Sequence, residues 1–396
     1  MTVTETATRR PIPFDAKQLD KLMDEAGIDV LVATSKHNVQ YLLGGYRFYF
    51  FDTMDAVGIT RYLPAVIYQK GKPENAAYVG CAMENFEREL GKFWPPTLDL
   101  KVVGSKETMA QAVDHIKKLG HVRRIGVEPG FMPSDGDAVL REGMSNCEIV
   151  DAVLPLERLR ARKTPEEVGY LRQASERVVD AMQATFHNHC APGATKLEVV
   201  EALRREEVNR GLVFDYCLMT AGPSLNRAPS DQRLAKGDII SLDSGGNYKG
   251  YIGDLCRMGI VGGKPDQELV DLLAFIDEVQ QAVRKPIRPG NRGGDICATA
   301  EKILDASPHR KYAHFMAHGM GLVTHEAPRL MNYARLSYTG YDMERPLEPG
   351  MVVSIETTVA HPKRGFVKLE DTTIIVTVDG YEAVGDGYRG WTTAGQ

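Results

Sequence analysis

Two stretches of the sequence each carry a pair of carboxylates placed symmetrically about a turn. In IISLDSGGNYKGYIGDLCRMGIV, Asp243 and Asp254 are equidistant from an expected hairpin tip at Tyr248 and Lys249. Residues directly opposite each other in an antiparallel pair have Cβ atoms only about 5 Å apart on the same face. We therefore expect these two carboxylates to be close enough to hold a metal ion together.

The same pattern recurs in VVSIETTVAHPKRGFVKLEDTTIIV, where Glu356 and Glu370 are equally far from Lys363 at the centre of the HPKRG turn. A single acid in a strand is usually a solvated surface residue. Two mirrored pairs inside apolar strands instead indicate a buried cluster. Four buried carboxylates repel each other and raise each other's pKa, so they need protonation or a compensating cation, for which we expect divalent metal.

A histidine-containing segment, HFMAHGMGLVTHEAPRL, lies between these two hairpins. His318 would add an imidazole to the carboxylates, and this mixture favours manganese, iron, cobalt or zinc over magnesium or calcium. His325 is then available to bind a substrate oxygen or to stabilise developing charge. Glu356 is the better candidate base, although Glu326 could also take a proton. We interpret His314 as structural.

The segments around these motifs predict an α+β protein of two domains, because 396 residues exceed the size of one core. Residues 1–160 alternate helical and extended patterns, which indicates an N-terminal α/β domain. Residues 161–396 form the expected catalytic domain, starting with a helix capped by Thr164, Pro165 and Glu167. Thr195 and Glu198 cap a second helix, and the order helix, helix, hairpin then occurs twice, as in a duplicated architecture.

Composition excludes several classes of protein. A formal net charge of -5 gives no electrostatic footprint for nucleic acid or an anionic membrane. The N-terminus lacks an apolar signal segment and no run approaches the roughly 20 apolar residues of a membrane span, so we expect a cytoplasmic protein. The scattered cysteines favour reduced core thiols over disulfides or a zinc knuckle.

From about residue 160 to 390, the sequence resembles the pita-bread superfamily of methionine aminopeptidase, aminopeptidase P, prolidase and creatinase. The motifs that carry this resemblance are SLDSGG, GDLCR, HGMGL, EPGMVVSIE and KLED. The resemblance implies two metal ions with a bridging hydroxide, held by five residues that here are Asp243, Asp254, His318, Glu356 and Glu370. The first domain resembles the N-terminal domain of creatinase and prolidase, on its topology and on TSKHNVQYL, which implies a homodimer.

Three positions depart from the family pattern where a peptide substrate would be handled. Asn226 stands where the peptidases have a substrate-binding histidine, and an amide cannot act as an acid at neutral pH. Cys256 replaces the usual threonine, and Lys368 replaces the usual arginine, keeping the charge but losing bidentate geometry. Arg329 falls where creatinase has a carboxylate-binding arginine, although a surface arginine is an equal alternative.

The resulting hypothesis is a metal-dependent hydrolase that cleaves the C-N bond of a small substrate. It would resemble an Xaa-Pro dipeptidase or aminopeptidase but act on a compact carboxylate-bearing molecule. Alternatives are an amidohydrolase like creatinase or ectoine hydrolase, a lyase of dimethylsulfoniopropionate, and a non-catalytic binding module, which the complete ligand set disfavours. Tyr46, Arg47 and Phe50 could roof a small pocket, or could belong to a buried aromatic cluster.

Overall fold

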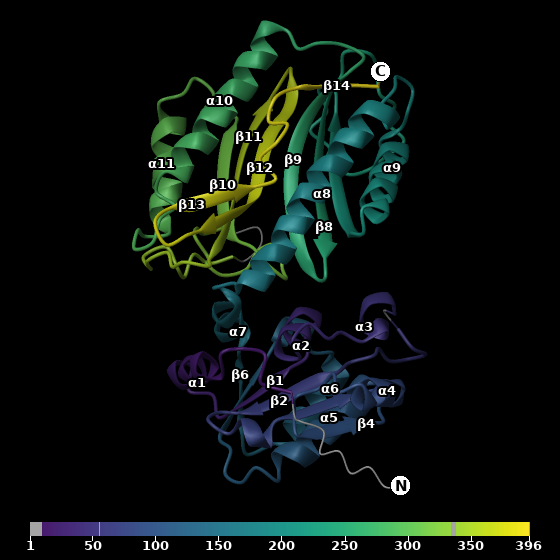
Figure 1. Cartoon of the computed structure of the whole chain (residues 1–396), viewed down its shortest axis with the longest axis vertical. Coiled ribbons are helices and arrows are strands. Elements are labelled where there is room, and N and C mark those ends of the chain that lie inside the picture. The colour runs from purple at the N-terminus through teal and green to yellow at the C-terminus, as the bar shows by residue number, and fades with distance from the viewer. Residues whose placement is uncertain (1–9, 55, 334–337, 396) are drawn as a thin grey trace. The chain divides into compact units, whose positions relative to one another are not determined.

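The computed structural model describes residues 10–54, 56–333 and 338–395. The chain divides into two compact units, residues 1–159 and 160–396 (Figure 1). In the part of the chain that is described, no helix is long and apolar enough to cross a membrane. The six cysteines are unpaired, four of them buried and two half-buried.

The first unit is built on a mixed six-stranded sheet in the order β4-β3-β2-β1-β5-β6. Its strands are β1 (Val30–Ala33), β2 (Ala65–Gln69), β3 (Ala77–Gly80), β4 (Thr97–Leu100), β5 (Arg124–Val127) and β6 (Glu148–Asp151). Its α-helices are α1 (Ala16–Glu25), α2 (Lys36–Leu42), α3 (Tyr49–Thr53), α4 (Asn85–Glu89), α5 (Ser105–Ile116), α6 (Ser134–Gly143) and α7 (Val153–Arg160).

Both faces of this first sheet are buried, as strand β1 shows. Leu31 and Ala33 pack into one apolar core, whereas Val30 and Val32 pack into another on the opposite face. Side chains alternate between the two faces of a strand, so a run of four apolar residues serves both cores. The expected α/β organisation of this region is confirmed.

The second unit contains an eight-stranded sheet whose main path runs β10-β11-β12-β9-β8-β7. Its helices are α8 (Pro165–His189), α9 (Lys196–Asn209), α10 (Gln267–Arg284) and α11 (Gly294–Asp305). Its strands are β7 (Val213–Ala221), β8 (Ile239–Tyr248), β9 (Tyr251–Val261), β10 (Ala313–Gly319), β11 (Val352–His361), β12 (Gly365–Val376), β13 (Tyr381–Val384) and β14 (Thr392–Ala394).

The elements of the second unit occur in two equivalent sets. Two helices, one strand and a hairpin (α8, α9, β7, β8, β9) are followed by the same series (α10, α11, β10, β11, β12). The two sets join in one sheet where β9 pairs with β12, at Cys256 and Glu370. This confirms the duplicated architecture, and the capping boxes at Thr164 and Thr195 begin α8 and α9 as expected.

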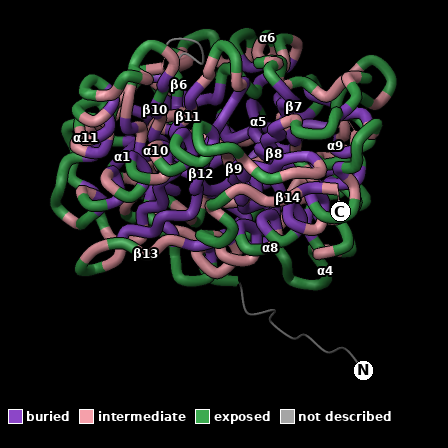
Figure 2. Tube along the Cα trace, turned by 90° about the horizontal axis from the view of Figure 1, so that it is seen from above, coloured by how far each residue is buried: buried purple, intermediate pink, exposed green. Residues whose placement is uncertain are grey.

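The helices pack against one face of the second sheet (Figure 1). Gly253 on β9 is packed so closely on α8 that a Cβ there would lie 2.6 Å from the backbone nitrogen of Ser175. Because side chains alternate along a strand, Asp254 and Cys256 point away from this helix layer. The strands β8, β9 and β12 are buried almost throughout their length (Figure 2).

The register of the first hairpin differs from the expectation. Tyr248 pairs with Tyr251, so the tip is Lys249 and Gly250, both with positive φ, and Asp254 lies opposite Gly245 while Asp243 lies opposite Cys256. The prediction that Asp243 and Asp254 are directly opposite is therefore wrong. The two-residue turn, with two left-handed positions, forms one residue later in the chain than expected. Asp243 and Asp254 are therefore diagonal neighbours on the same face of the sheet.

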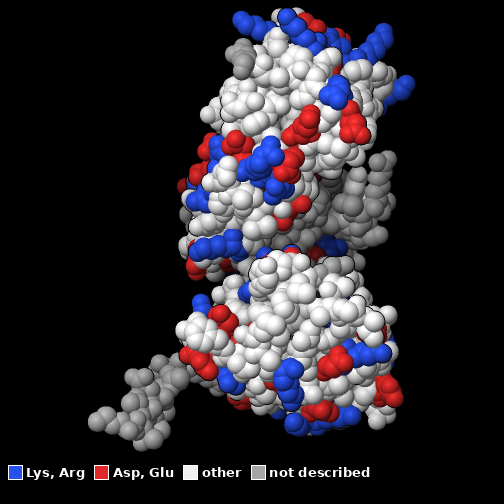
Figure 3. All heavy atoms as spheres, turned by 90° about the vertical axis from the view of Figure 1, so that its right-hand side faces the viewer, with Lys and Arg blue, Asp and Glu red and all other residues white. Residues whose placement is uncertain are grey.

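The register of the second hairpin follows the expectation. Glu356 pairs directly with Glu370, and His361 pairs with Gly365 across the turn centred on Lys363. This prediction is confirmed. On the face drawn in Figure 3, basic and acidic side chains are interspersed on each unit, a pattern that creates no strong field of one sign there.

Candidate metal centre

Two clusters of potential metal-binding side chains lie on the second sheet and the segment that follows β10. One contains Asp243, Asp254 and Glu370, from β8, β9 and β12, and the other contains His318, His325 and Glu356. Within each cluster, one ligand atom per residue lies within 4.8 Å of the others. The five residues expected as ligands are thus brought together, and His325 joins them.

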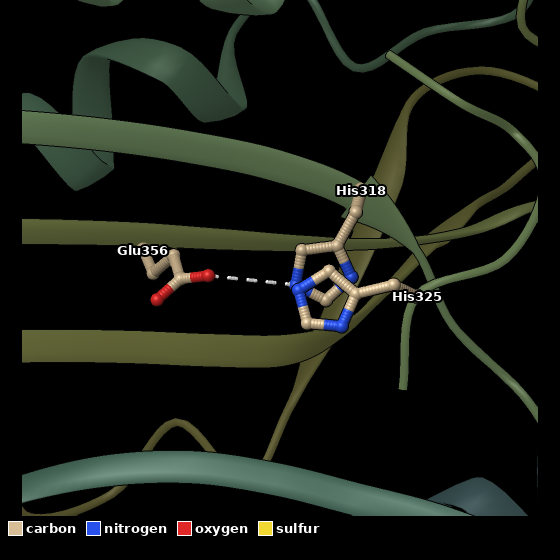
Figure 4. A group of neighbouring side chains, drawn as sticks. All are labelled: His318, His325 and Glu356. Carbon is tan, nitrogen blue, oxygen red and sulfur yellow. Dashed lines mark ion pairs between the residues drawn. The ribbon is translucent and has the colours of Figure 1, made fainter. Parts of the chain in front are cut away.

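The histidines lie with their rings stacked, 4.0 Å between centroids (Figure 4). His318 Nδ1 is 3.0 Å from the Gly319 carbonyl oxygen, and its Nε2 faces Glu356 Oε1 at 3.6 Å. Burial, and secondarily the neighbouring His318, lowers the pKa of His325 to about 3. His325 is therefore a neutral imidazole at physiological pH, the form that binds metal or donates one hydrogen bond.

Several buried polar atoms in these clusters have no hydrogen-bond partner among the described residues. They include Asp254 Oδ1, His318 Nε2 and His325 Nε2. Such atoms are costly to bury without a partner, and native proteins rarely tolerate them. Burial, together with the neighbouring carboxylates, also raises the pKa values of Asp254 and Glu370. A set of carboxylate oxygens and imidazole nitrogens that lack partners fits divalent transition-metal ions.

Lys368 lies in the middle of the carboxylates. Its Nζ is 2.7 Å from Asp243 Oδ2, 2.6 Å from Glu356 Oε2 and 2.7 Å from Glu370 Oε2. Burial alone would lower the pKa of Lys368, but the carboxylates of Asp243, Glu356 and Glu370 raise it well above its ordinary value. Sequence reasoning noted this lysine only as a replacement for arginine and did not place it at the centre of the site.

Asn226 lies in the loop after β7, where its side chain is exposed. Its Oδ1 accepts a hydrogen bond from the Ala228 backbone at 3.1 Å, and its carbonyl accepts one from Lys196 Nζ at 2.7 Å. The next residue, Arg227, reaches the cluster and donates to Asp243 Oδ2. The sequence analysis did not predict this role of Arg227, although Arg227 directly follows Asn226 in the segment LNRAPSDQ.

Cys256 is buried on β9 between two members of the carboxylate cluster. It is the direct register partner of Asp243 on β8 and of Glu370 on β12. Burial, and then the charge of Asp243, raises the pKa of its thiol well above the usual range. In the protein without bound metal, the thiol is therefore protonated at neutral pH.

Arg329 is half-buried, with its guanidinium carbon 5.2 Å from the centroid of Tyr338 and 5.7 Å from that of Tyr341. Stacking of this kind fixes the plane of a guanidinium. His314 is exposed on β10 and belongs to neither ligand cluster.

Glu326, the other proton acceptor considered from the sequence, pairs with two cations and belongs to neither ligand cluster. It is fully buried, 2.9 Å from Arg160 Nη2 and 3.0 Å from Lys163 Nζ. Burial alone would raise its pKa, but Lys163 and Arg160 hold the pKa below its ordinary value. Glu326 is therefore an ionised partner of two cations, which fixes the segment that carries His325.

The aromatic residues Tyr46 and Phe50 take part in contacts inside the first unit. Tyr46 donates to Glu84 Oε2 at 3.0 Å and packs edge-on against Phe93. Phe50 packs against Phe48 and Tyr62, and Arg47 pairs with Asp52 at 2.8 Å. These contacts favour the alternative that the residues belong to an aromatic cluster over the alternative that they cover a substrate pocket.

Two family models match the chain. The model of metallopeptidase family M24 matches residues 169–377, and the model of the creatinase/prolidase N-terminal domain matches residues 16–162. The first match spans more than half of the chain and includes both hairpins.

Similar proteins match nearly all of the chain or its larger part. An Xaa-Pro dipeptidase of Pyrococcus horikoshii is 25% identical over 377 residues, 92% of this chain and 94% of that protein. A probable dipeptidase of Mycobacterium tuberculosis is 31% identical over 235 residues, 58% of this chain and 60% of that protein.

Solved structures share the fold. The prolidase from Pyrococcus horikoshii superimposes with a TM-score of 0.76 at 21% identity, covering 94% of this chain and 97% of that one. An Xaa-Pro dipeptidase from Bacillus anthracis gives a TM-score of 0.77 at 23% identity, covering 96% of this chain and 98% of that one.

Proposed function

The chain belongs to metallopeptidase family M24, a family of metallohydrolases, and from this premise we propose that it cleaves the amide C-N bond of a small carboxylate-bearing substrate. An Xaa-Pro dipeptide is the first candidate, because a relative that is similar over nearly its whole length is named for that activity. Dimethylsulfoniopropionate, creatine and ectoine derivatives are further compact molecules to test.

The observation that carries this proposal is the convergence of Asp243, Asp254, Glu370, His318 and Glu356 in two adjoining clusters with unpartnered buried atoms. Two divalent ions bound by such a set polarise a carbonyl and activate water when present. The mixture of carboxylate and imidazole ligands supports manganese, cobalt, iron or zinc as the native metal.

Each remaining site residue has a proposed role that its surroundings support. Glu356 serves as the base that receives a proton from water: burial would raise its pKa, but Lys368 and His318 keep it ionised. His325 is neutral and has an unpartnered Nε2 among the described residues, so it can donate to a substrate oxygen in the appropriate tautomer. Arg329, with its plane fixed by two tyrosines, is suited to bind a substrate carboxylate.

A substrate panel tests this proposal. Metal-reconstituted protein is assayed with an Xaa-Pro dipeptide, an Xaa-Pro tripeptide, creatine, an ectoine derivative and dimethylsulfoniopropionate. We expect amide hydrolysis of a small member and little or no cleavage of the tripeptide. Efficient tripeptide cleavage would exclude the restriction to small substrates, and an elimination product without any amide hydrolysis would replace the hydrolase by a lyase.

We also propose a homodimer as the working form. Several large apolar side chains are exposed on the first unit, which supports a contact with another protein surface. They are Tyr49, Ile59, Met83, Phe86 and Leu90. Light scattering over a range of concentrations should give twice the mass of one chain, and a monomer at every concentration would refute the dimer.

A further inference from the structure

Lys368 brings a positive charge into the position where divalent ions would be expected. Its side chain is almost fully buried, and its ammonium is within 2.7 Å of oxygens from three of the candidate ligands. Lys368 precedes Glu370 by two residues on β12, so both point to the same face of the sheet. The ammonium is a compact point charge, so all three oxygens lie close to one positive centre.

The three contacts are divided unequally between the two clusters. Asp243 and Glu370 belong to one cluster, so this cluster gives two of its three carboxylates to Lys368. The other cluster gives only Glu356 Oε2, while Glu356 Oε1 still faces His318 Nε2. The histidine cluster therefore keeps more of its ligand atoms available.

The balance of charges in the site also indicates that one metal ion binds more readily than two. Asp243, Asp254, Glu356 and Glu370 carry four negative charges when ionised. Two cations already contact these carboxylates, because Arg227 donates to the same Asp243 oxygen that Lys368 contacts. One divalent ion would balance the remaining charge, and a second would have to enter beside a buried ammonium.

We infer that Lys368 is an internal cation that competes with one of the two metal ions. The first ion binds through His318 and Glu356, beside His325. The second ion, between Asp243, Asp254 and Glu370, binds only when the Lys368 ammonium is displaced from the carboxylates. In the metal-free protein the same ammonium holds these carboxylates together. The inference rests on the metal centre of the proposed function.

A titration of the metal-free, full-length protein with Co²⁺ tests the inference, with isothermal calorimetry and dialysis to count bound ions. We expect wild type to bind two ions in separate steps. In Lys368→Met, which keeps an unbranched side chain one atom shorter but removes the charge, the second Kd should fall about tenfold or more, since a unit charge a few ångströms away no longer repels the ion. Without metal, this variant should melt at a lower temperature than wild type and gain more on adding Co²⁺.

Lys196→Met is the matched control, because Lys196 is equally buried but donates to the Asn226 carbonyl. It should leave both Kd values unchanged. If Lys368→Met does not fold, Lys368→Gln and the two-step titration of wild type carry the test. Two ions binding to wild type with one affinity, or an unchanged second Kd in the Lys368 variants, would overturn the inference alone. No Co²⁺ bound by wild type or variants would instead refute the metal centre itself.

Discussion

Glu356 on β11 and Glu370 on β12 are direct partners in the antiparallel register, and both contact the single ammonium of Lys368. Each of the two glutamates belongs to a different cluster of candidate ligands. The β11–β12 hairpin therefore links the two halves of the candidate metal centre, and removal of a carboxylate should affect metal binding before it affects the fold.

Asp254→Ala and Glu370→Ala should abolish turnover while leaving the fold largely intact, because each removes a ligand rather than a packing group. The loss in kcat/KM should exceed the roughly 10- to 100-fold that is typical of changes outside the ligand shell. Elemental analysis should show less metal per chain. Asp379→Ala, which removes an exposed carboxylate beyond β12, is the control and should retain both metal and activity. Full activity in both ligand variants would rule out the metal mechanism.

Asp371, next to Glu370, should contribute strongly to stability through its cations. It is buried and contacts Arg257 at 3.2 Å and Arg284 at 3.0 Å, as well as Arg389. Burial alone would raise its pKa, but these arginines lower it well below the ordinary range.

Because Asp371→Ala removes the buried carboxylate that three arginines share, we expect it to lower the free energy of unfolding by about 3–5 kcal/mol. Denaturant titration measures this change. Glu201→Ala breaks only exposed pairs, with Arg204 and Arg205, and should change the free energy of unfolding far less. Equal effects of the two substitutions would contradict the prediction.

Glu207 on α9 should make stability fall as the pH rises. It is buried, its Oε1 accepts from Ser244 Oγ at 2.8 Å, and its Oε2 has no hydrogen-bond partner among the described residues. Burial raises its pKa from 4.5 to about 8. The folded state therefore favours the neutral acid, and the stability that this group contributes is fully present below about pH 4.5 and is lost as the pH rises through about 8.

Glu207→Gln keeps a neutral side chain at every pH, so the variant should be more stable than wild type above about pH 8 and should lose this part of the pH dependence. The gain should reach a few kcal/mol, since each pKa unit corresponds to about 1.4 kcal/mol. The neighbouring Glu206 pairs with Arg210, and Glu206→Gln should give no such gain. Parallel stability curves for wild type and Glu207→Gln from about pH 5 to 9 would refute the assignment.

The sequence predicted local features well where one turn or cap determines them. The Glu356–Glu370 register followed from a turn with a clear centre, and the Thr164 cap from its own four residues. The first hairpin was misplaced by one residue, because GGNYKG allows more than one two-residue turn and Lys249 adopts a positive φ that few residues take.

Long-range partners were harder to predict, because periodicity does not show which cation lies beside an acid. Glu326 pairs with Arg160 and Lys163, which are more than 160 residues away in the chain. Lys368 was within reach of sequence reasoning, since a residue two positions before Glu370 must share its face of the strand. Its contact with Asp243, 125 residues earlier, required the tertiary structure.

The last prediction concerns Asn226, the position where the family resemblance led us to expect a histidine. Asn226→His should raise turnover of an Xaa-Pro dipeptide by up to about 10²-fold, the low end of acid-base contributions, because a histidine can carry a proton and an amide cannot. The loop already approaches the centre through Arg227, which contacts Asp243. The exposed Asn226 side chain could therefore be replaced without disturbing the apolar core.

Measuring kcat and KM separately, with metal content held equal, shows whether the gain lies in catalysis. Asn209→His, at the exposed end of α9, is the matched control and should change neither constant. If Asn226→His binds metal normally and its dipeptide turnover stays at the wild-type level, this position does not limit dipeptide turnover, and Arg329 and the loop around it become the residues to vary.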